Sequence, residues 1–213
     1  MATGSARETC QALLIDLDGV VRIFDPTVSQ GVEERYGLPQ GILTKVAFEP
    51  MRLRPAITGQ ISHDEWMAEV AREIGRSLDD EARAQAAVQE WNTYRGQVDQ
   101  AVLDFVREVR RAGIRVGLAT NATDWLEADL ERLGLVGEFD AVINSSVVGY
   151  IKPSRDFFRA ACLAVQAEPK VTLFVDDTDR NVLGARAADL SAYRYNGPED
   201  FRYLRAVLGL RAA

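Results

Sequence analysis

Two apolar stretches of the sequence each end in a pair of carboxylates. Asp16 and Asp18 close the stretch LLIDLDG, and Asp176 and Asp177 close LFVDD. Taken alone, either pair is also typical of a turn or of the start of a helix. Residues two apart on an extended strand face the same side, so Asp16 and Asp18 can address one ligand. Four carboxylates in one crevice would repel one another without a cation, and all-oxygen ligands suit a hard ion. The two pairs therefore predict a Mg²⁺ site.

Three further polar residues follow two other apolar stretches. Thr120 and Asn121 come directly after GLA, and Lys152 stands in GYIKP. Each alone is ambiguous, because Asn121 or Thr123 could cap the following helix and most lysines are solvated. Together a hydroxyl, an amide and an ammonium group can bind the oxygens of an anion. Beside a Mg²⁺ ion they predict a phosphate receptor, and phosphoryl transfer needs little beyond a nucleophile, a proton donor and positive charge.

A parallel sheet is the element that would bring these residues together. Helical periodicity covers residues 98–111 and residues 153–167, and the second helix is expected to begin at Pro153. Strands that alternate with such helices predict an α/β fold, with a Rossmann-like parallel sheet whose ligand lies at the carboxyl ends of the strands. The five stretches with strand character are Ala12–Ile15, Ile114–Ala119, Ala141–Ile143, Val171–Val175 and Ala192–Tyr195.

About a hundred residues separate the first two of these strands, too many for one crossover. Ser62 and Glu65 have capping-box spacing at the start of one helical pattern. We therefore predict an all-helical domain over residues 26–97, inserted into a catalytic core formed by residues 1–25 and 98–213. The expected helical stretches are 29–54, 62–74 and 79–94, and the expected hinges are Asp25–Pro26 and Gly96–Val98.

Composition limits the partners. The formal net charge of −7 argues against nucleic acid, whose binding proteins usually show a basic excess. Cys10 and Cys162 have no metal-like spacing and are typical of free thiols in a reducing compartment. The first ten residues lack the apolar stretch of a signal peptide, and no stretch approaches the length of a membrane span. We expect a cytoplasmic monomer or homodimer that binds a small phosphorylated substrate, with no membrane or nucleic-acid partner.

The types of these polar clusters and their order along the chain resemble the motifs of the haloacid dehalogenase-like (HAD) hydrolase superfamily. The resemblance extends from about Ala12 to Leu208. The helical insertion resembles the C1-type cap of that family. Residues 59–66 are similar to caps of bacterial sugar-phosphate phosphatases and of the N-terminal domain of soluble epoxide hydrolase. Val20 stands where threonine is commoner in the family. The matching motifs are Asp16-Leu17-Asp18-Gly19, Thr120-Asn121, Lys152-Pro153 and Asp176-Asp177.

The resemblance implies a role for each acidic residue. Asp16 would attack phosphorus and form an aspartyl-phosphate, and Asp18 would protonate the leaving oxygen and later activate water. Mg²⁺ would be held by the carboxylate of Asp16, the backbone carbonyl of Asp18 and Asp177, with Asp176 helping directly or through water. The family's dehalogenases lack an acid at the position of Asp18, because a halide needs no proton on leaving. Asp18 therefore favours phosphate esters as substrates.

The resemblance also implies the substrate-binding residues. Thr120 and Lys152 would bind the phosphoryl oxygens, with Asn121 beside them. Arg22 and Phe24 would lie in the segment that lines the entrance in relatives with this kind of cap. The substrate implied is a sugar phosphate or a similar phosphomonoester.

Two other functions fit the same residues. A sugar-phosphate mutase shares all four motifs but retains the phosphate on its aspartate. A non-catalytic scaffold that binds phosphate would keep the geometry without turnover. His63, the only histidine, stands in the helical insertion beside the capping box and is expected at the surface rather than in the site.

Overall fold

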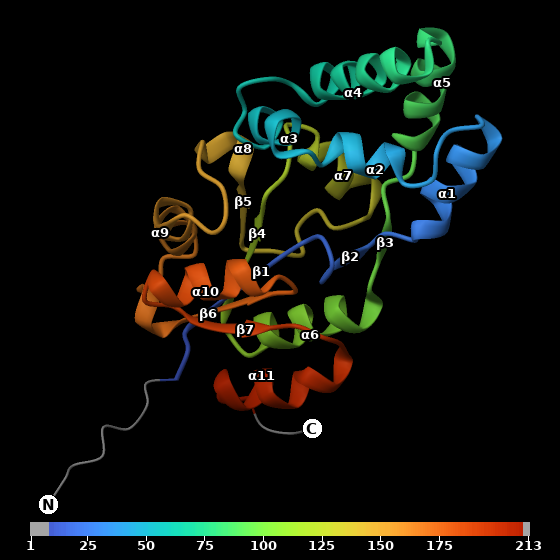
Figure 1. Ribbon diagram of the computed structural model, residues 1–213. Coiled ribbons are helices and arrows are strands. Elements are labelled where there is room, and N and C mark those ends of the chain that lie inside the picture. Colours follow the sequence, from blue (N-terminus) through green and yellow to red (C-terminus); the bar gives the residue numbers. More distant parts are fainter. Residues whose placement is uncertain (1–8, 211–213) are drawn as a thin grey trace, which may run out of the picture.

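The computed structural model describes residues 9–210 of the 213-residue chain. Most of the N-terminal decapeptide used to predict that there is no signal peptide lies outside the described residues. Five parallel strands form one sheet at the centre of the fold (Figure 1). Their order across the sheet is β5 (Ala141–Asn144), β4 (Arg115–Thr120), β1 (Ala12–Ile15), β6 (Thr172–Asp176) and β7 (Ser191–Arg194). The predicted α/β fold with a Rossmann-like parallel sheet is confirmed.

Side chains of β1 alternate between two apolar cores, one on each face of the sheet. Leu13 and Ile15 belong to one core, and Ala12 and Leu14 belong to the other. Because successive strand residues point to opposite faces, a strand buried on both sides reads as a continuous apolar stretch. This explains why β1 could be recognised from the sequence.

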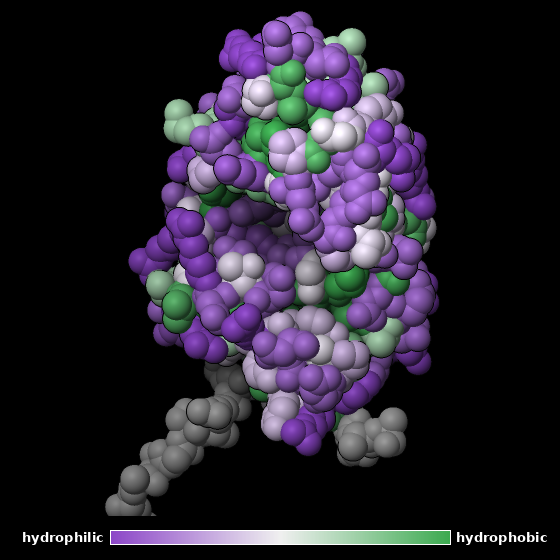
Figure 2. All heavy atoms as spheres, turned by 45° about the vertical axis from the view of Figure 1, so that its right-hand side comes forward, coloured by the Kyte–Doolittle hydropathy of each residue, from purple (hydrophilic) through white to green (hydrophobic). Residues whose placement is uncertain are grey.

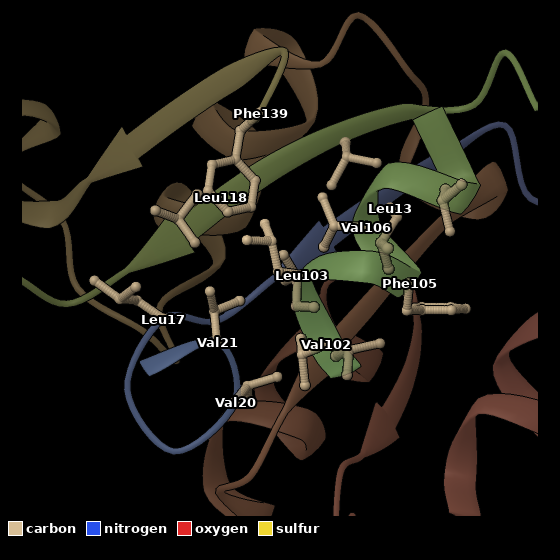
Figure 3. Packing of buried hydrophobic residues seen from close by; sticks show 14 of the residues in the cluster. Leu13, Leu17, Val20, Val21, Val102, Leu103, Phe105, Val106, Leu118 and Phe139 are labelled. Carbon is tan, nitrogen blue, oxygen red and sulfur yellow. The ribbon is translucent and has the colours of Figure 1, made fainter. Parts of the chain in front are cut away.

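Helices cover both faces. The first core lies under α6 (Gln100–Arg111), α7 (Leu126–Arg132) and α11 (Phe201–Val207), and the second lies under α9 (Arg155–Ala164) and α10 (Asp179–Ala187). Figure 3 shows Val102, Leu103 and Val106 of α6 clustered with Val20 and Val21, which follow the first aspartate pair. Val20 is therefore a buried packing residue, and this accounts for an apolar side chain at that position. The remaining short elements are α8 (Ser145–Val148) and the 3₁₀ turns Pro169–Val171 and Pro198–Asp200.

The segment between the first two sheet strands is helical and has an apolar core of its own. This core is built from residues 32–91 and includes Trp66, Val70 and Ile74 of α4. On both sides of the segment the chain runs through a short antiparallel pair, β2 (Arg22–Ile23) with β3 (Gln97–Val98), so the two connections lie side by side. The five helices are α1 (Pro26–Arg35), α2 (Ile42–Ala47), α3 (Pro50–Ile57), α4 (His63–Leu78) and α5 (Glu81–Trp91), and they gather on one side of the sheet (Figure 1).

Some predicted helix starts differ from the structure. The helix expected from Pro153 begins at Arg155, because the side chain of Ser154 accepts from the N–H of Phe157 and caps it. Neither Asn121 nor Thr123 is the N-cap of α7, which begins later, after Trp125. The capping box of Ser62 and Glu65 is confirmed. The strands β2 and β3 were not predicted, because two residues are too few to show a period.

Over residues 9–210, we find no helix that combines the length and the apolar character required to cross a membrane.

Candidate active site

The carboxyl ends of β1 and β6 bring two aspartates together. Ile15 is aligned with Val175, and the N–H of Asp16 donates to the carbonyl oxygen of Val175 over 2.9 Å. Asp16 and Asp176 therefore occupy neighbouring positions at one edge of the sheet. Both are buried, with exposed fractions of 6% and 0%. Strand pairing alone accounts for this convergence.

Lys152 joins the two carboxylates. Its Nζ lies 2.6 Å from Oδ1 of Asp16 and 2.7 Å from Oδ2 of Asp176, and the whole residue is buried. The N–H of Leu17 donates to the same Oδ1 of Asp16 over 2.7 Å. Burial by itself would lower the pKa of Lys152, but Asp16 and Asp176 raise it above its ordinary value. The side chain is thus held as an ammonium group between two acids.

Asp177 completes an acidic cluster that could hold a metal ion. One carboxylate oxygen from each of Asp16, Asp176 and Asp177 lies within 4.8 Å of the other two. Burial raises the pKa of Asp16 well above its ordinary value; Lys152 opposes this shift, and the charge of Asp176 adds to it. Burial also raises the pKa of Asp177. Three ionised carboxylates against one lysine leave two negative charges in excess, which a divalent cation would balance.

Side-chain amides hold the loop that carries Lys152 and the carboxylate of Asp176 at the end of β6. The amide of Asn121 donates to the carbonyl oxygen of Lys152 over 3.2 Å, and its own oxygen accepts from the N–H of Lys152 over 2.8 Å. Asp176 accepts from the N–H of Thr178 over 2.9 Å and from the amide of Asn181 over 3.1 Å to each oxygen. Asn121, which we expected beside the phosphate, is therefore engaged with the backbone of Lys152.

Thr120 reaches the same edge of the sheet from the other side of β1. It is the last residue of β4, whose Leu118 is aligned with Ile15. The residue is buried, with an exposed fraction of 1%. The structure thus brings Thr120, Lys152 and the acidic cluster to the carboxyl ends of three adjacent parallel strands, β4, β1 and β6.

The carboxylate of Asp18 is paired with Arg22. The Nε and Nη2 of Arg22 donate to its two oxygens over 2.6 and 3.0 Å. The Nη1 of Arg22 donates to Asp129 over 2.8 Å, and Asp129 also accepts twice from Arg95, over 2.6 Å each. Arg22 was expected to face the substrate, and in the structure its guanidinium is shared by two carboxylates. We call Asp18, Arg22, Asp129 and Arg95 the ion-pair chain.

The sequence analysis did not single out Asp129 or Arg95. Asp129 lies on α7 between Leu126 and Leu130, and all three are buried. A charged residue on the apolar side of a helix is the signal that was available, because a buried carboxylate needs a partner. Burial alone would raise the pKa of Asp129, but the bonds from Arg95 and Arg22 lower it below its ordinary value. Arg95 carried no such signal.

The prediction that His63 lies at the surface is wrong. The residue is 3% exposed, and its ring is stacked on Trp125 with centroids 4.2 Å apart. Its Nδ1 lies 3.0 Å from Oγ1 of Thr123, and its Nε2 lies 2.8 Å from Oδ1 of Asn92. Position beside a capping box suggested exposure, but the first turn of α4 packs against the loop before α7. His63 therefore contributes a contact between the helical segment and the sheet-bearing part.

A chamber of about 380 Å³ lies between the strand ends and the helical segment, and Asp18 and Asn121, rather than the acidic cluster itself, line it on the side of the strands. Asp18, Asn121 and Ala122 line it from the strand ends, and Phe48 and Trp66 are among the residues that line it from the helical segment. Figure 2 shows the surface hollowed between the upper and the lower part of the molecule, with hydrophilic residues on the visible floor. The volume falls in the range of small-molecule sites.

Comparisons with known proteins found a matching family model and several relatives. The family model described as haloacid dehalogenase-like hydrolase matches residues 10–189. A haloacid dehalogenase-like hydrolase domain-containing protein of Bos taurus is 30% identical over 148 residues, which is 66% of this chain and 59% of the bovine protein. A phosphatase of Mycobacterium tuberculosis is 28% identical over 189 residues, 85% of each protein.

The fold also matches solved structures. One is a HAD family enzyme of Bacteroides thetaiotaomicron in complex with magnesium and inorganic phosphate, at a TM-score of 0.66 and 23% identity. This match covers 92% of the present chain and 98% of the bacterial one. The segment matched by the family model contains every cluster described above and most of the chain. The chain therefore belongs to the haloacid dehalogenase-like hydrolase family.

Proposed function

We propose that this protein is a Mg²⁺-dependent phosphatase that hydrolyses a small phosphomonoester through an aspartyl-phosphate on Asp16. The observation that carries the proposal is the buried arrangement of Lys152 between Asp16 and Asp176, with Asp177 completing the cluster. A magnesium- and phosphate-bound relative in fold and a phosphatase relative in sequence support it.

The acidic cluster suits a hard divalent cation, because it offers oxygen ligands and has two negative charges in excess. Asp16, Asp176 and Asp177 would hold Mg²⁺, with the backbone carbonyl of Asp18 as a further ligand. When bound, the ion would draw negative charge from the phosphoryl oxygens and lower their repulsion of the nucleophile.

Asp16 is the proposed nucleophile. Lys152 and the N–H of Leu17 both engage its Oδ1, which fixes the carboxylate in one orientation. Among the described residues, its Oδ2 has no hydrogen-bond donor, so this oxygen is the better placed to attack phosphorus. Thr120 and Lys152 would bind the equatorial oxygens, and Asn121 would hold Lys152 in place.

Asp18 is the proposed acid and base. It would give a proton to the leaving oxygen and then take one from the water that hydrolyses the aspartyl-phosphate. Arg22 donates to both oxygens of its carboxylate, which fixes the orientation of that carboxylate. Through Asp129 and Arg95, the ion-pair chain would link Asp18 to the predicted hinge at Gly96–Val98, which follows Arg95 in the sequence.

The helical segment, residues 26–97, is proposed to act as a cap over the site. It lies across the chamber from the strand ends and is joined to the rest by the paired strands β2 and β3. Closure over a bound ester would exclude water from the aspartyl-phosphate until the leaving group has departed.

The test is phosphate release from a panel of phosphomonoesters, with Mg²⁺ or with EDTA, for the wild type and Asp16→Asn. We expect Mg²⁺-dependent turnover that falls by at least about a thousandfold in the variant, because it lacks the nucleophile. The matched control is Asp156→Asn, which changes an exposed aspartate of α9 and should retain activity.

Acid quench during turnover, followed by mass spectrometry, should find phosphate on the peptide that contains Asp16. Hydrolysis that survives Asp16→Asn would contradict the nucleophile assignment. Transfer of the phosphate to another position of the substrate, without release, would identify a mutase instead. Binding of phosphate without any turnover would identify a scaffold.

A further inference from the structure

The walls of the chamber bear on the chemical nature of the leaving group. Apart from the residues of the strand ends and the ion-pair chain, large apolar side chains make up much of the lining. Five aromatic residues contribute, namely Phe24, Phe48, Trp66, Trp91 and Tyr94. Four further apolar side chains are Leu53, Ile57, Met67 and Leu126.

Two of these aromatic rings are left exposed in the chamber wall. Phe48 is 54% exposed although its ring lies against Trp66 and Trp91, with centroids 6.2 and 6.4 Å apart. Phe24 is 45% exposed and packs edge-on against Tyr94 at 5.9 Å. Rings that are clustered but not covered mark a surface from which a ligand can exclude water.

The polar atoms of the two indoles are already used. The Nε1 of Trp66 donates to the carbonyl oxygen of Ala47 over 3.1 Å, and the Nε1 of Trp91 donates to Oγ of Ser29 over 2.9 Å. These two indoles can therefore contact a ligand only through the apolar surface of their rings.

Several charged and polar residues of the chamber are engaged as well. Both ring nitrogens of His63 have partners, and Arg22 and Arg95 share Asp129. A sugar hydroxyl that lies against these residues or against the apolar wall would have to displace these bonds or lose its own hydrogen bonds to water, and the hydroxyls of Ser29 and Tyr94 are too few to serve a whole polyol. Buried hydroxyls without partners weaken binding, so this lining disfavours a polyol.

We propose that the leaving group of the substrate is an apolar group of ring size, such as a cycloalkyl or aryl alcohol, and not a polyol. This rests on the proposed phosphatase function, because the ester oxygen would lie at Asp18 and the hydrocarbon group in the chamber. A cavity of about 150 Å³ already holds benzene, so 380 Å³ has room for a substituted or two-ring group. The same lining opposes a sugar-phosphate mutase.

The test compares cyclohexylmethyl phosphate with glucose 6-phosphate. Both are esters of a primary alcohol on a six-membered ring, so they differ mainly in the hydroxyl groups and the ring oxygen. We expect kcat/KM to be at least about tenfold higher for cyclohexylmethyl phosphate. Equal values, or a preference for glucose 6-phosphate, would overturn the inference.

A matched pair of variants assigns the preference to the chamber. Phe48→Ala should lower the ratio of the two kcat/KM values about three- to tenfold, because it removes an exposed ring from the wall. Met51→Ala changes a residue of the same segment that is 82% exposed and does not line the chamber, and it should leave the ratio unchanged. An unchanged ratio in Phe48→Ala would count against the inference.

A binding measurement separates this inference from the proposed function. Trp66 and Trp91 line the chamber, so their emission should change on titration with cyclohexylmethanol and not with glucose, in the wild type and in Asp16→Asn alike. Binding of the alcohol without hydrolysis of any ester would refute the phosphatase and support the apolar chamber. Hydrolysis with no emission change and no preference between the two esters would refute the chamber alone.

Discussion

The position after the first aspartate pair, Asp16 and Asp18, requires a glycine, Gly19. Its φ is +85°, a left-handed conformation that glycine adopts without strain. A Cβ atom there would lie 2.2 Å from Oδ2 of Asp177, well inside van der Waals contact. The glycine therefore serves two needs, the turn after β1 and the close approach of an acid from the end of β6.

Gly19→Ala should weaken Mg²⁺-dependent activity at least about tenfold and raise the Mg²⁺ concentration needed for half of it, because Asp177 must move. The measurement is activity against Mg²⁺ concentration. Gly113→Ala is the control, since Gly113 has a φ of +82° with no atom within 4 Å of the added Cβ. It should lose about 1–2 kcal/mol of stability from strain and keep its Mg²⁺ requirement. If Gly19→Ala and Gly113→Ala showed the same change in the Mg²⁺ concentration needed for half of the activity, the role given to Asp177 would be contradicted.

At the scale of elements, α3 and α4 touch the sheet-bearing part at defined atoms. The carbonyl oxygen of Ile57, at the end of α3, accepts from Oγ of Ser145 over 2.6 Å. The N–H of His63, at the start of α4, donates to Asp124 over 2.7 Å. A Cβ on Gly59 would lie 2.2 Å from the carbonyl oxygen of Ser146. These contacts close one side of the chamber, and an opening of the proposed cap would have to break them.

The surroundings of His63 lower the pKa of its imidazole. Burial lowers its pKa, and its bond to Asn92 only partly opposes this; Arg95 lowers the pKa further, while Asp129 and Asp64 raise it. Because Oδ1 of Asn92 can only accept, Nε2 must donate to it, and Nδ1 can then accept from Thr123. Burial and these contacts therefore favour the neutral ring in the folded protein.

Protonation of His63 should make stability depend on pH. The folded pKa lies below the unfolded value of about 6.5, so the unfolded chain binds the proton first and stability falls as the pH drops below that value. Urea unfolding in EDTA between pH 7.5 and 5 should show a steeper loss for the wild type than for His63→Gln, by on the order of 1 kcal/mol. Parallel curves for the two proteins would mean that His63 has no depressed pKa.

At the scale of the whole molecule, the acidic cluster is a source of instability that a cation should relieve. The cluster joins β1, β6 and the loop that carries Lys152, and its ionised form has two negative charges in excess. Burial raises the pKa values of Asp16 and Asp177, and the neighbouring charge of Asp176 raises both further. A ligand that binds only the folded chain stabilises it in proportion to the logarithm of its concentration.

Mg²⁺ should therefore raise the unfolding temperature. At a hundred times its dissociation constant we expect about 2.7 kcal/mol, which for a chain of this size is on the order of 5–10 °C. Differential scanning calorimetry checks this, with NaCl at equal ionic strength as the control for screening. Asp177→Asn should reduce the Mg²⁺ effect, and an equal rise with NaCl would show that the cation is not bound at the cluster.

The sequence by itself determined the sheet and the residues that converge at its edge. Strands such as Ala12–Ile15 are buried on both faces and so read as apolar stretches, and parallel pairing sends their polar ends to one place. Asp16, Lys152 and Asp176 could be predicted as site residues because each stands at or after the end of an apolar stretch that is visible in the sequence.

Only the tertiary structure decided the surroundings of that edge. Arg22 meets Asp129 across 107 positions, and His63 meets Thr123 across 60, so neither contact leaves a period or a motif in the sequence. The chamber likewise depends on how α2 to α5 pack over the strand ends. Local patterns predict which residues are buried or polar. Which distant residues pair, and what shape they enclose, follows from the packing of the whole chain.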